Sequence, residues 1–225
     1  MTLATRSTQI ERMDTDCVDF ADYRRCLRDL ARVNTVTLTH RPMLRWLSQR
    51  ASGAFSLLDV ACGYGDALRL IQRRFPEARL TGIDLNPWAT RAASEAGGPE
   101  VKIAFLTQDV FAYSPPEKFD FIITSQFTHH LTNEQVVKLL RWLEANAARG
   151  WFIGDIQRHA LAYYGFPILA RLAFWHHLVR EDGQISIARG FRRAEWTTLL
   201  RQAEISSDRA RITWHVPFRL CVGTR

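Results

Sequence analysis

The chain has 225 residues, of which 47% are hydrophobic and 24% are charged. These proportions are typical of a globular domain and exclude disordered and collagen-like chains. The net charge of +7 comes from arginines spread over almost every segment, whereas a nucleic-acid-binding protein more often concentrates its basic residues in one patch or tail. We therefore expect a small-molecule partner and disfavour nucleic acid.

Neither an export signal nor a membrane span is predicted. The first 16 residues lack the apolar core that export requires. The most apolar window, residues 160–179, is interrupted by Gly165, Pro167 and Arg171, so it falls short of the roughly 20 apolar residues of a membrane span. Four scattered cysteines without a CxxC pair favour free thiols in a reducing compartment. We expect a cytoplasmic protein.

The first 54 residues are predicted to form an N-terminal helical cap. Apolar residues over positions 19–33 follow the spacing of one helical stripe, and a second short helix is predicted over residues 42–49. From residue 55 onward the pattern changes to short apolar runs that alternate with helical stretches. This alternation is typical of a parallel sheet covered by helices on both faces.

The second part of the chain, residues 55–225, is predicted to form one α/β domain. Five apolar runs predict strands at residues 55–61, 80–84, 101–106, 119–125 and 151–156. Helices are predicted between them at residues 67–75, 87–96 and 133–147. The fold class is therefore a doubly wound, mostly parallel sheet.

The region after the fifth strand departs from this alternation. Residues 158–192 are predicted to form a helical lid with one long helix over 160–179, and a further helix follows at 194–203. Two final runs, at 210–216 and 218–224, are separated only by Pro217. A parallel pair needs a crossover of about a dozen residues, so these runs predict a C-terminal antiparallel hairpin that brings the sheet to seven strands.

The turn after the first predicted strand carries the main chemical signal. Gly63 and Gly65 allow the backbone to bend tightly and a ligand to approach, and Asp84 ends the second strand, where a carboxylate can accept both ribose hydroxyls. Leu68 stands where the dinucleotide motif has its third glycine. Asp59 lies just before the turn, where it would repel a pyrophosphate and attract a cationic ligand.

At these positions the sequence resembles the class I S-adenosylmethionine-dependent methyltransferases, over residues 55–225. Residues 59–65 match the acidic, glycine-rich first motif of that family, and Asp84 matches its ribose-binding acid. Residues 108–110 and 119–125 match the segment after the third strand and the fourth strand. The resemblance implies a Rossmann-like methyltransferase domain with S-adenosylmethionine as cofactor.

The resemblance also implies which residues bind the cofactor. Asp59 and the carbonyl of Ala61 would receive its ammonium group, Leu85 would lie against the purine, and Asp109 would accept from the exocyclic amine. The full predicted set is Asp59, Ala61, Gly63, Gly65, Asp84, Leu85, Asp109, Val110 and Ser125.

Two residues near the ends of the fourth and fifth strands are predicted to be catalytic. His129 has a side chain whose ordinary pKa suits a general base at neutral pH. Asp155 should face the acceptor chamber. The motifs of DNA amino-methylating enzymes and the acids of metal-dependent catechol enzymes are missing from these positions, so we expect no metal.

The acceptor is predicted from the lid. Its aromatic residues would roof the acceptor chamber, namely Tyr163, Tyr164, Phe166, Phe174 and Trp175. An aromatic roof favours a small aromatic or apolar acceptor, as in secondary metabolism, with oxygen as the preferred acceptor atom. Two alternatives stay open: an RNA or protein methyltransferase that uses the arginine-rich surface, and a non-catalytic regulator that only binds the cofactor. The oligomeric state is not predicted.

Overall fold

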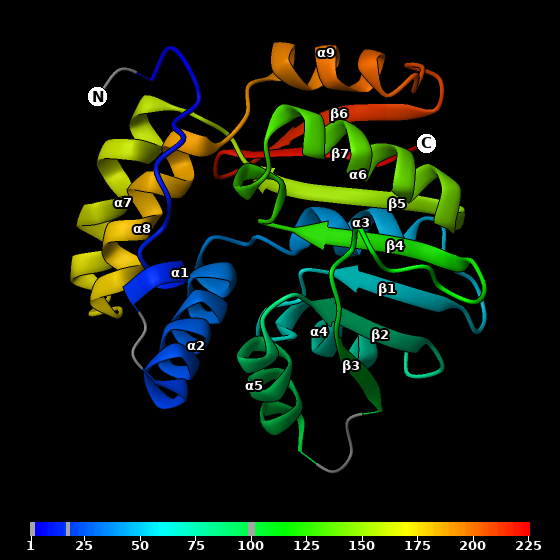
Figure 1. The fold of residues 1–225 in the computed structure, drawn as a ribbon, viewed down its shortest axis with the longest axis horizontal. Helices are drawn as coiled ribbons and strands as arrows, with labels where there is room; N and C mark the ends of the chain where they lie inside the picture. The colour runs from blue at the N-terminus through cyan, green and yellow to red at the C-terminus, as the bar shows by residue number, and fades with distance from the viewer. Residues whose placement is uncertain (1–2, 17–18, 99–101) are drawn as a thin grey trace.

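A seven-stranded sheet organises the protein, as the sequence predicts (Figure 1). The computed structural model describes residues 3–16, 19–98 and 102–225. The strands are β1 (Ser56–Val60), β2 (Arg79–Asp84), β3 (Ile103–Thr107), β4 (Phe119–Ser125), β5 (Ala147–Ile156), β6 (Ala210–His215) and β7 (Arg219–Thr224). Their order is β3-β2-β1-β4-β5-β7-β6, and only the pairs that involve β7 are antiparallel. Val101, where the third strand was predicted to begin, lies outside the described residues.

The described residues also form nine α-helices and one 3-10 turn. The α-helices are α1 (Met13–Asp16), α2 (Phe20–Val36), α3 (Arg41–Ser48), α4 (Asp66–Arg74), α5 (Pro87–Gly97), α6 (Asn133–Asn146), α7 (Ala160–Leu172), α8 (His177–Arg189) and α9 (Arg193–Gln202), and the 3-10 turn is η1 (Thr128–His130). Among the described residues, no helix combines the length and the apolar character that crossing a membrane requires.

Helices cover both faces of the sheet, and each face has its own core. Helices α6 and α9 lie on one face (Figure 1). Trp151 and Trp196 are completely buried in the core on this face. On the other face α3 and α4 pack over Phe121 and Leu57, which are also fully buried. Because both faces are covered, the central strands are nearly continuous apolar runs, which is why the sequence pattern identifies them.

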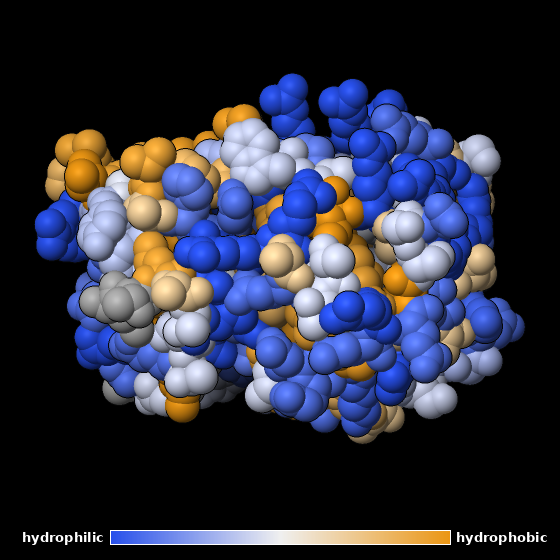
Figure 2. Space-filling model, turned by 90° about the horizontal axis from the view of Figure 1, so that it is seen from above, coloured by the Kyte–Doolittle hydropathy of each residue, from blue (hydrophilic) through white to orange (hydrophobic). Residues whose placement is uncertain are grey.

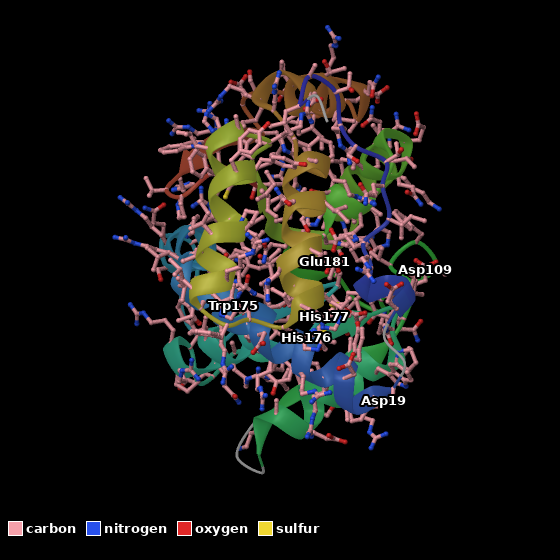
Figure 3. All side chains as sticks on the ribbon, turned by 90° about the vertical axis from the view of Figure 1, so that its left-hand side faces the viewer. Asp19, Asp109, Trp175, His176, His177 and Glu181 are labelled. Atoms are coloured by element: carbon pink, nitrogen blue, oxygen red, sulfur yellow. The ribbon has the colours of Figure 1, made fainter. Side chains whose placement is uncertain are left out.

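The lid differs from the single long helix that was predicted over residues 160–179. It consists of two helices, α7 and α8, which lie side by side and are joined near Trp175 and His176 (Figure 3). The chain turns at Phe174, whose φ is +53°, and the side chain of His176 then caps α8 by accepting from the Leu178 amide. Gly183 of α8 lets the Phe166 ring of α7 approach closely, because a Cβ atom there would overlap the ring. The helix break therefore produces a packed helical hairpin.

The N-terminal segment before α1 is not helical, although residues 1–54 were predicted as a helical cap. Over residues 3–12 it runs along α8 and η1. The Ser7 amide donates to the Ala188 carbonyl at 3.0 Å, and Arg6 Nη2 donates to the Leu131 carbonyl at 2.9 Å. This segment brings residues from the start of the chain to the carboxyl edge of the sheet. The boundary between a cap and a domain at residue 55 stays a prediction.

Candidate active site

The turn between β1 and α4 has the conformation that its glycines permit. Gly63 and Gly65 have φ values of +51° and +71°, and Ala61 also takes a positive φ of +57°. A Cβ atom at Gly65 would lie 2.8 Å from the Phe105 ring, so this position requires glycine. The Gly63 amide donates to Asp84 Oδ2 at 2.9 Å, which ties the turn to the end of β2. The first motif and Asp84 therefore lie together, as predicted.

Asp59 is buried at the inner end of this turn. Its side chain is 2% exposed, and its Oδ1 atom accepts no hydrogen bond within the part of the chain that the structure describes. Burial, reinforced by Asp66 and Asp84, raises the pKa of Asp59 well above its usual value. A buried carboxylate in this state is suited to receive a cationic group.

Asp59 lines a cavity of about 150 Å³ at the carboxyl edge of the sheet. We call this the cofactor cavity; its wall includes Glu11, Asn34, Asp59, Ala61, Gly63, Tyr64, Asp66, Ser125, Gln126, His129 and His130. Four predicted cofactor residues, Asp59, Ala61, Gly63 and Ser125, therefore meet on one surface. The orphaned Asp59 oxygen fits the ammonium group of S-adenosylmethionine.

The other predicted cofactor residues lie beyond this cavity, near the ends of β2 and β3. Asp84 also accepts from the Asn86 amide at 2.9 Å, and burial raises its pKa. The Leu85 side chain is 71% exposed, which leaves an apolar surface free for a flat ring. Asp109 is exposed and accepts from the Phe111 amide at 2.9 Å, while Val110 is buried beside it. Gly65 is the N-cap residue of α4 and does not line the cavity.

His129 and Asp155 form a buried pair beneath the cofactor cavity. His129 Nδ1 lies 2.7 Å from Asp155 Oδ1, and the His129 amide donates to Asp155 Oδ2 at 2.9 Å. The Thr128 hydroxyl and the Ile156 amide also donate to Asp155, so this carboxylate is fully engaged. The structure therefore brings together the two residues that were predicted to be catalytic.

Glu11 is a third member of this cluster that the sequence did not indicate. Its Oε1 atom lies 3.4 Å from His129 Nε2 and accepts from the Ser186 hydroxyl at 2.7 Å. No motif surrounds Glu11, and only the path of the N-terminal segment places it here. His129 thus lies between two carboxylates.

These contacts fix the charges of the cluster. Burial opposes the charge on His129, but Asp155 and Glu11 outweigh it and raise the histidine pKa to about 9. Burial likewise disfavours charge on both acids, yet contacts with His129 hold the pKa of Asp155 and of Glu11 at about 2. In this arrangement His129 is positively charged at neutral pH.

A second, apolar cavity of about 260 Å³ adjoins the first. We call this the apolar cavity; α2, α7, α8, the end of β5 and the turn before β7 form its wall, which includes Leu30, Val33, Ile156, Leu161, Phe166, Leu169, Val179, Ile187, Phe218 and Arg219. Four residues line both cavities, namely Glu11, Leu30, Gln126 and Ser186. The two cavities therefore share one junction.

The lid contributes fewer aromatic side chains to this cavity than predicted. Of the five, only Phe166 belongs to the cavity wall. Tyr164 and Phe174 are 65% and 91% exposed, and apolar side chains gather on the outer surface at the end of the molecule where α7 lies (Figure 2). A cavity lies beside the lid, but aliphatic residues outnumber aromatic residues in its wall, and its use as an acceptor chamber stays a prediction.

Comparisons with known proteins agree with this geometry. Residues 57–150 match the protein-family model described as a methyltransferase domain. A malonyl-[acyl-carrier protein] O-methyltransferase of Ilyobacter polytropus is 31% identical over 71 residues, which are 32% of this chain and 26% of that protein. A trans-aconitate 2-methyltransferase of Streptomyces avermitilis is 30% identical over 97 residues, which are 42% of this chain and 36% of that protein. The chain thus spans only 26% and 36% of the length of these two curated relatives.

A solved structure shows the same fold over almost the whole chain. Magnesium protoporphyrin IX methyltransferase from Synechocystis PCC 6803, with bound S-adenosylmethionine, superposes with a TM-score of 0.62. The identity is 15%, and the match covers 96% of this chain and 98% of that chain. The extra helices and the C-terminal hairpin are therefore part of a known arrangement.

Proposed function

We propose that the protein is a class I S-adenosylmethionine-dependent methyltransferase that transfers a methyl group to a small acceptor, which the match of residues 57–150 to a methyltransferase domain supports. The observation that carries the proposal is the unpartnered, buried Asp59 carboxylate in a cavity that adjoins an apolar one. One cavity suits a cationic nucleoside and the other suits an acceptor. Their shared junction would bring the two reactants together.

The cofactor residues have distinct proposed roles. Asp59 and the Ala61 carbonyl would hold the ammonium group, and Asp84 would accept from the ribose hydroxyls. Leu85 and Val110 would contact the purine, and Asp109 would accept from its amine. Gly63, Gly65 and Ser125 would shape the surface on which the cofactor lies. These assignments are supported by the cavity wall and by the exposed Leu85 side chain.

When bound, S-adenosylmethionine supplies a methyl group on a positively charged sulfur. That methyl group would pass to an acceptor held at the junction of the two cavities. The apolar wall would exclude water from the reacting atoms, and the junction residues would align the acceptor. Alignment and exclusion of water are therefore the main contributions expected of this chain.

We propose a small apolar or aromatic acceptor, methylated at oxygen, without a metal ion. The aliphatic wall and the 260 Å³ volume support an apolar body. His129 and Asp155 stay our candidates for acid–base work at the junction. Because His129 already carries a proton between Asp155 and Glu11, it could deprotonate a hydroxyl only after losing that proton. An acceptor that arrives as an anion would not need this step.

The experiment that tests the proposed function is calorimetric titration with S-adenosylhomocysteine. Micromolar or tighter binding is expected, and Asp59→Asn should weaken it. Absence of binding to the wild-type protein would remove the proposal. Tight binding combined with no methyl transfer to any compound in a pooled small-molecule extract would favour the non-catalytic regulator instead.

A further inference from the structure

Arg219 places a buried positive charge in the wall of the apolar cavity. Arg219 is the first residue of β7, and it is 6% exposed. Nη1 donates to Gln126 Oε1 at 3.2 Å, and Nη2 donates to the hydroxyls of Thr37 and Thr39 at 2.7 Å each. Nε has no hydrogen-bond partner among the described residues. Every partner of this guanidinium is neutral.

Two other buried cationic side chains near the carboxyl edge of the sheet, Arg158 and His129, have an ionic partner. Arg158 donates to Glu195 at 2.7 Å, and His129 lies between Asp155 and Glu11. Within the described part of the chain, Arg219 has no carboxylate oxygen within 4.0 Å. Burial lowers its pKa to about 10, so it remains charged at neutral pH. The charge of Asp155 offsets only part of the effect of burial on Arg219. A buried charge without a direct ion pair is unfavourable, so an anion from outside the chain would complete the site.

The position of Arg219 is close to the junction of the two cavities. Gln126, which accepts from Arg219, lines both the apolar cavity and the cofactor cavity. The carboxylates in the wall of the apolar cavity, Glu11 and Asp182, belong to other elements and have their own donors. Asp182 accepts from the backbone amides of residues 12 and 13. An anion would therefore be attracted to Arg219 and repelled by Glu11 and Asp182.

From this arrangement we propose that the acceptor is an apolar carboxylic acid whose carboxylate binds Arg219. The inference rests on the proposed function and specifies its substrate class. A carboxylate can accept charge-assisted hydrogen bonds from the guanidinium N–H groups that Gln126 and the two threonines leave free, and the apolar wall would take the rest of the molecule. Binding at Arg219 places the carboxylate beside Gln126, next to the cofactor cavity. Such an acceptor is already an anion, so the charged state of His129 is no obstacle.

The test uses two probes that differ only in charge, 2-naphthoate and 2-naphthamide. Each is titrated calorimetrically into the full protein saturated with S-adenosylhomocysteine. The wild-type protein is expected to bind naphthoate at least tenfold more tightly than naphthamide. Arg219→Gln should lower the affinity for naphthoate at least tenfold and leave that for naphthamide unchanged. Arg171→Gln, which changes an exposed arginine of the lid, should leave both affinities unchanged and serves as the matched control.

Several outcomes would overturn the inference. The inference is contradicted if the wild-type protein does not bind naphthoate, or binds it no better than naphthamide. It is also contradicted if the Arg219→Gln variant prefers naphthoate over naphthamide as strongly as the wild-type protein does. If Arg219→Gln does not fold, Arg219→Lys replaces it. This variant keeps the positive charge but loses the several N–H donors of the guanidinium. It should therefore retain only part of the preference for naphthoate over naphthamide. S-adenosylhomocysteine binding is measured in the same samples. Its absence would refute the proposed function, whereas its presence without acid preference would refute only the role of Arg219.

Discussion

His129 Nδ1 lies 2.7 Å from Asp155 Oδ1, and this buried contact connects the turn after β4 to the end of β5. It couples the folded state to pH, because the ionised acid beside the ring raises the pKa of His129 in the folded protein. Glu11 adds a second carboxylate at 3.4 Å from the other ring nitrogen. The contribution of this cluster to stability therefore depends on the protonated state of His129.

We expect stability to fall as the pH rises above neutrality. The pKa of His129 is raised from 6.5 to about 9 on folding, so its contribution is complete below about pH 6.5 and is lost as the pH passes through about 9. The loss should approach roughly 3 kcal/mol, since one pKa unit corresponds to about 1.4 kcal/mol. Urea unfolding followed between about pH 6 and about pH 9 measures this slope.

Two variants distinguish the effect of this cluster on the pH dependence of stability from the effects of other ionisable groups. His129→Gln should flatten much of the alkaline slope, whereas His177→Gln, at an exposed residue that begins α8, should keep it. An unchanged slope in His129→Gln would refute the assignment. The alkaline range is chosen because burial, together with the charge on His129, lowers the pKa of His130 to about 4, so that this neighbour is neutral there.

Asp59→Asn is expected to separate ligand binding from folding. The wild-type carboxylate is buried, and burial raises its pKa, whereas a bound ammonium group would lower that pKa again. Binding of S-adenosylhomocysteine should therefore release a proton, which titrations in buffers of different ionisation enthalpy detect. The variant should bind at least about tenfold more weakly, as expected for one charge-assisted hydrogen bond, and release no proton. Asp208→Asn, at an exposed acid, should behave like the wild type.

Asp84→Ala should weaken binding of the same ligand more than it weakens the fold. Both carboxylate oxygens of Asp84 accept from backbone amides, those of Gly63 and Asn86. The variant loses the ribose acceptor and releases the turn that shapes the cofactor cavity, so the affinity should fall by roughly tenfold to a hundredfold. Calorimetry at constant pH measures this. Equal affinity in variant and wild type would contradict the proposed orientation of the ribose.

Two glycine-to-alanine changes should act in opposite directions. Gly65→Ala combines a φ of +71° with a Cβ position 2.8 Å from the Phe105 ring, so it should destabilise the protein by roughly 2 kcal/mol or more. Gly165 lies inside α7 with open space around its Cβ position. Gly165→Ala should stabilise the protein by about 0.5–1 kcal/mol. Chemical denaturation of both variants checks the pair, and a destabilised Gly165→Ala would contradict the helix assignment.

The sequence by itself determined the sheet and the cofactor motif, because both depend on short-range patterns. Apolar runs such as residues 119–125 identify buried strands, and the spacing of Asp59, Gly63, Gly65 and Asp84 needs only one strand, one turn and the next strand. The lid was predicted after the fifth strand, where the structure has it, but as one long helix and not as two. Local apolarity could not reveal that the chain turns at Phe174, since that turn depends on α7 and α8 packing against each other through Phe166 and Gly183.

Only the tertiary structure decided which side chains surround the reacting groups. Glu11 reaches His129 from 118 positions earlier in the chain, and Arg219 meets Thr37 from 182 positions later. Neither residue belongs to a motif, because its role depends on electrostatic contacts that form after distant elements pack. The spacing of apolar residues in the sequence reveals which face of a helix or strand is buried. Contacts between charged residues that are far apart in the chain do not change this spacing, so the sequence does not reveal them.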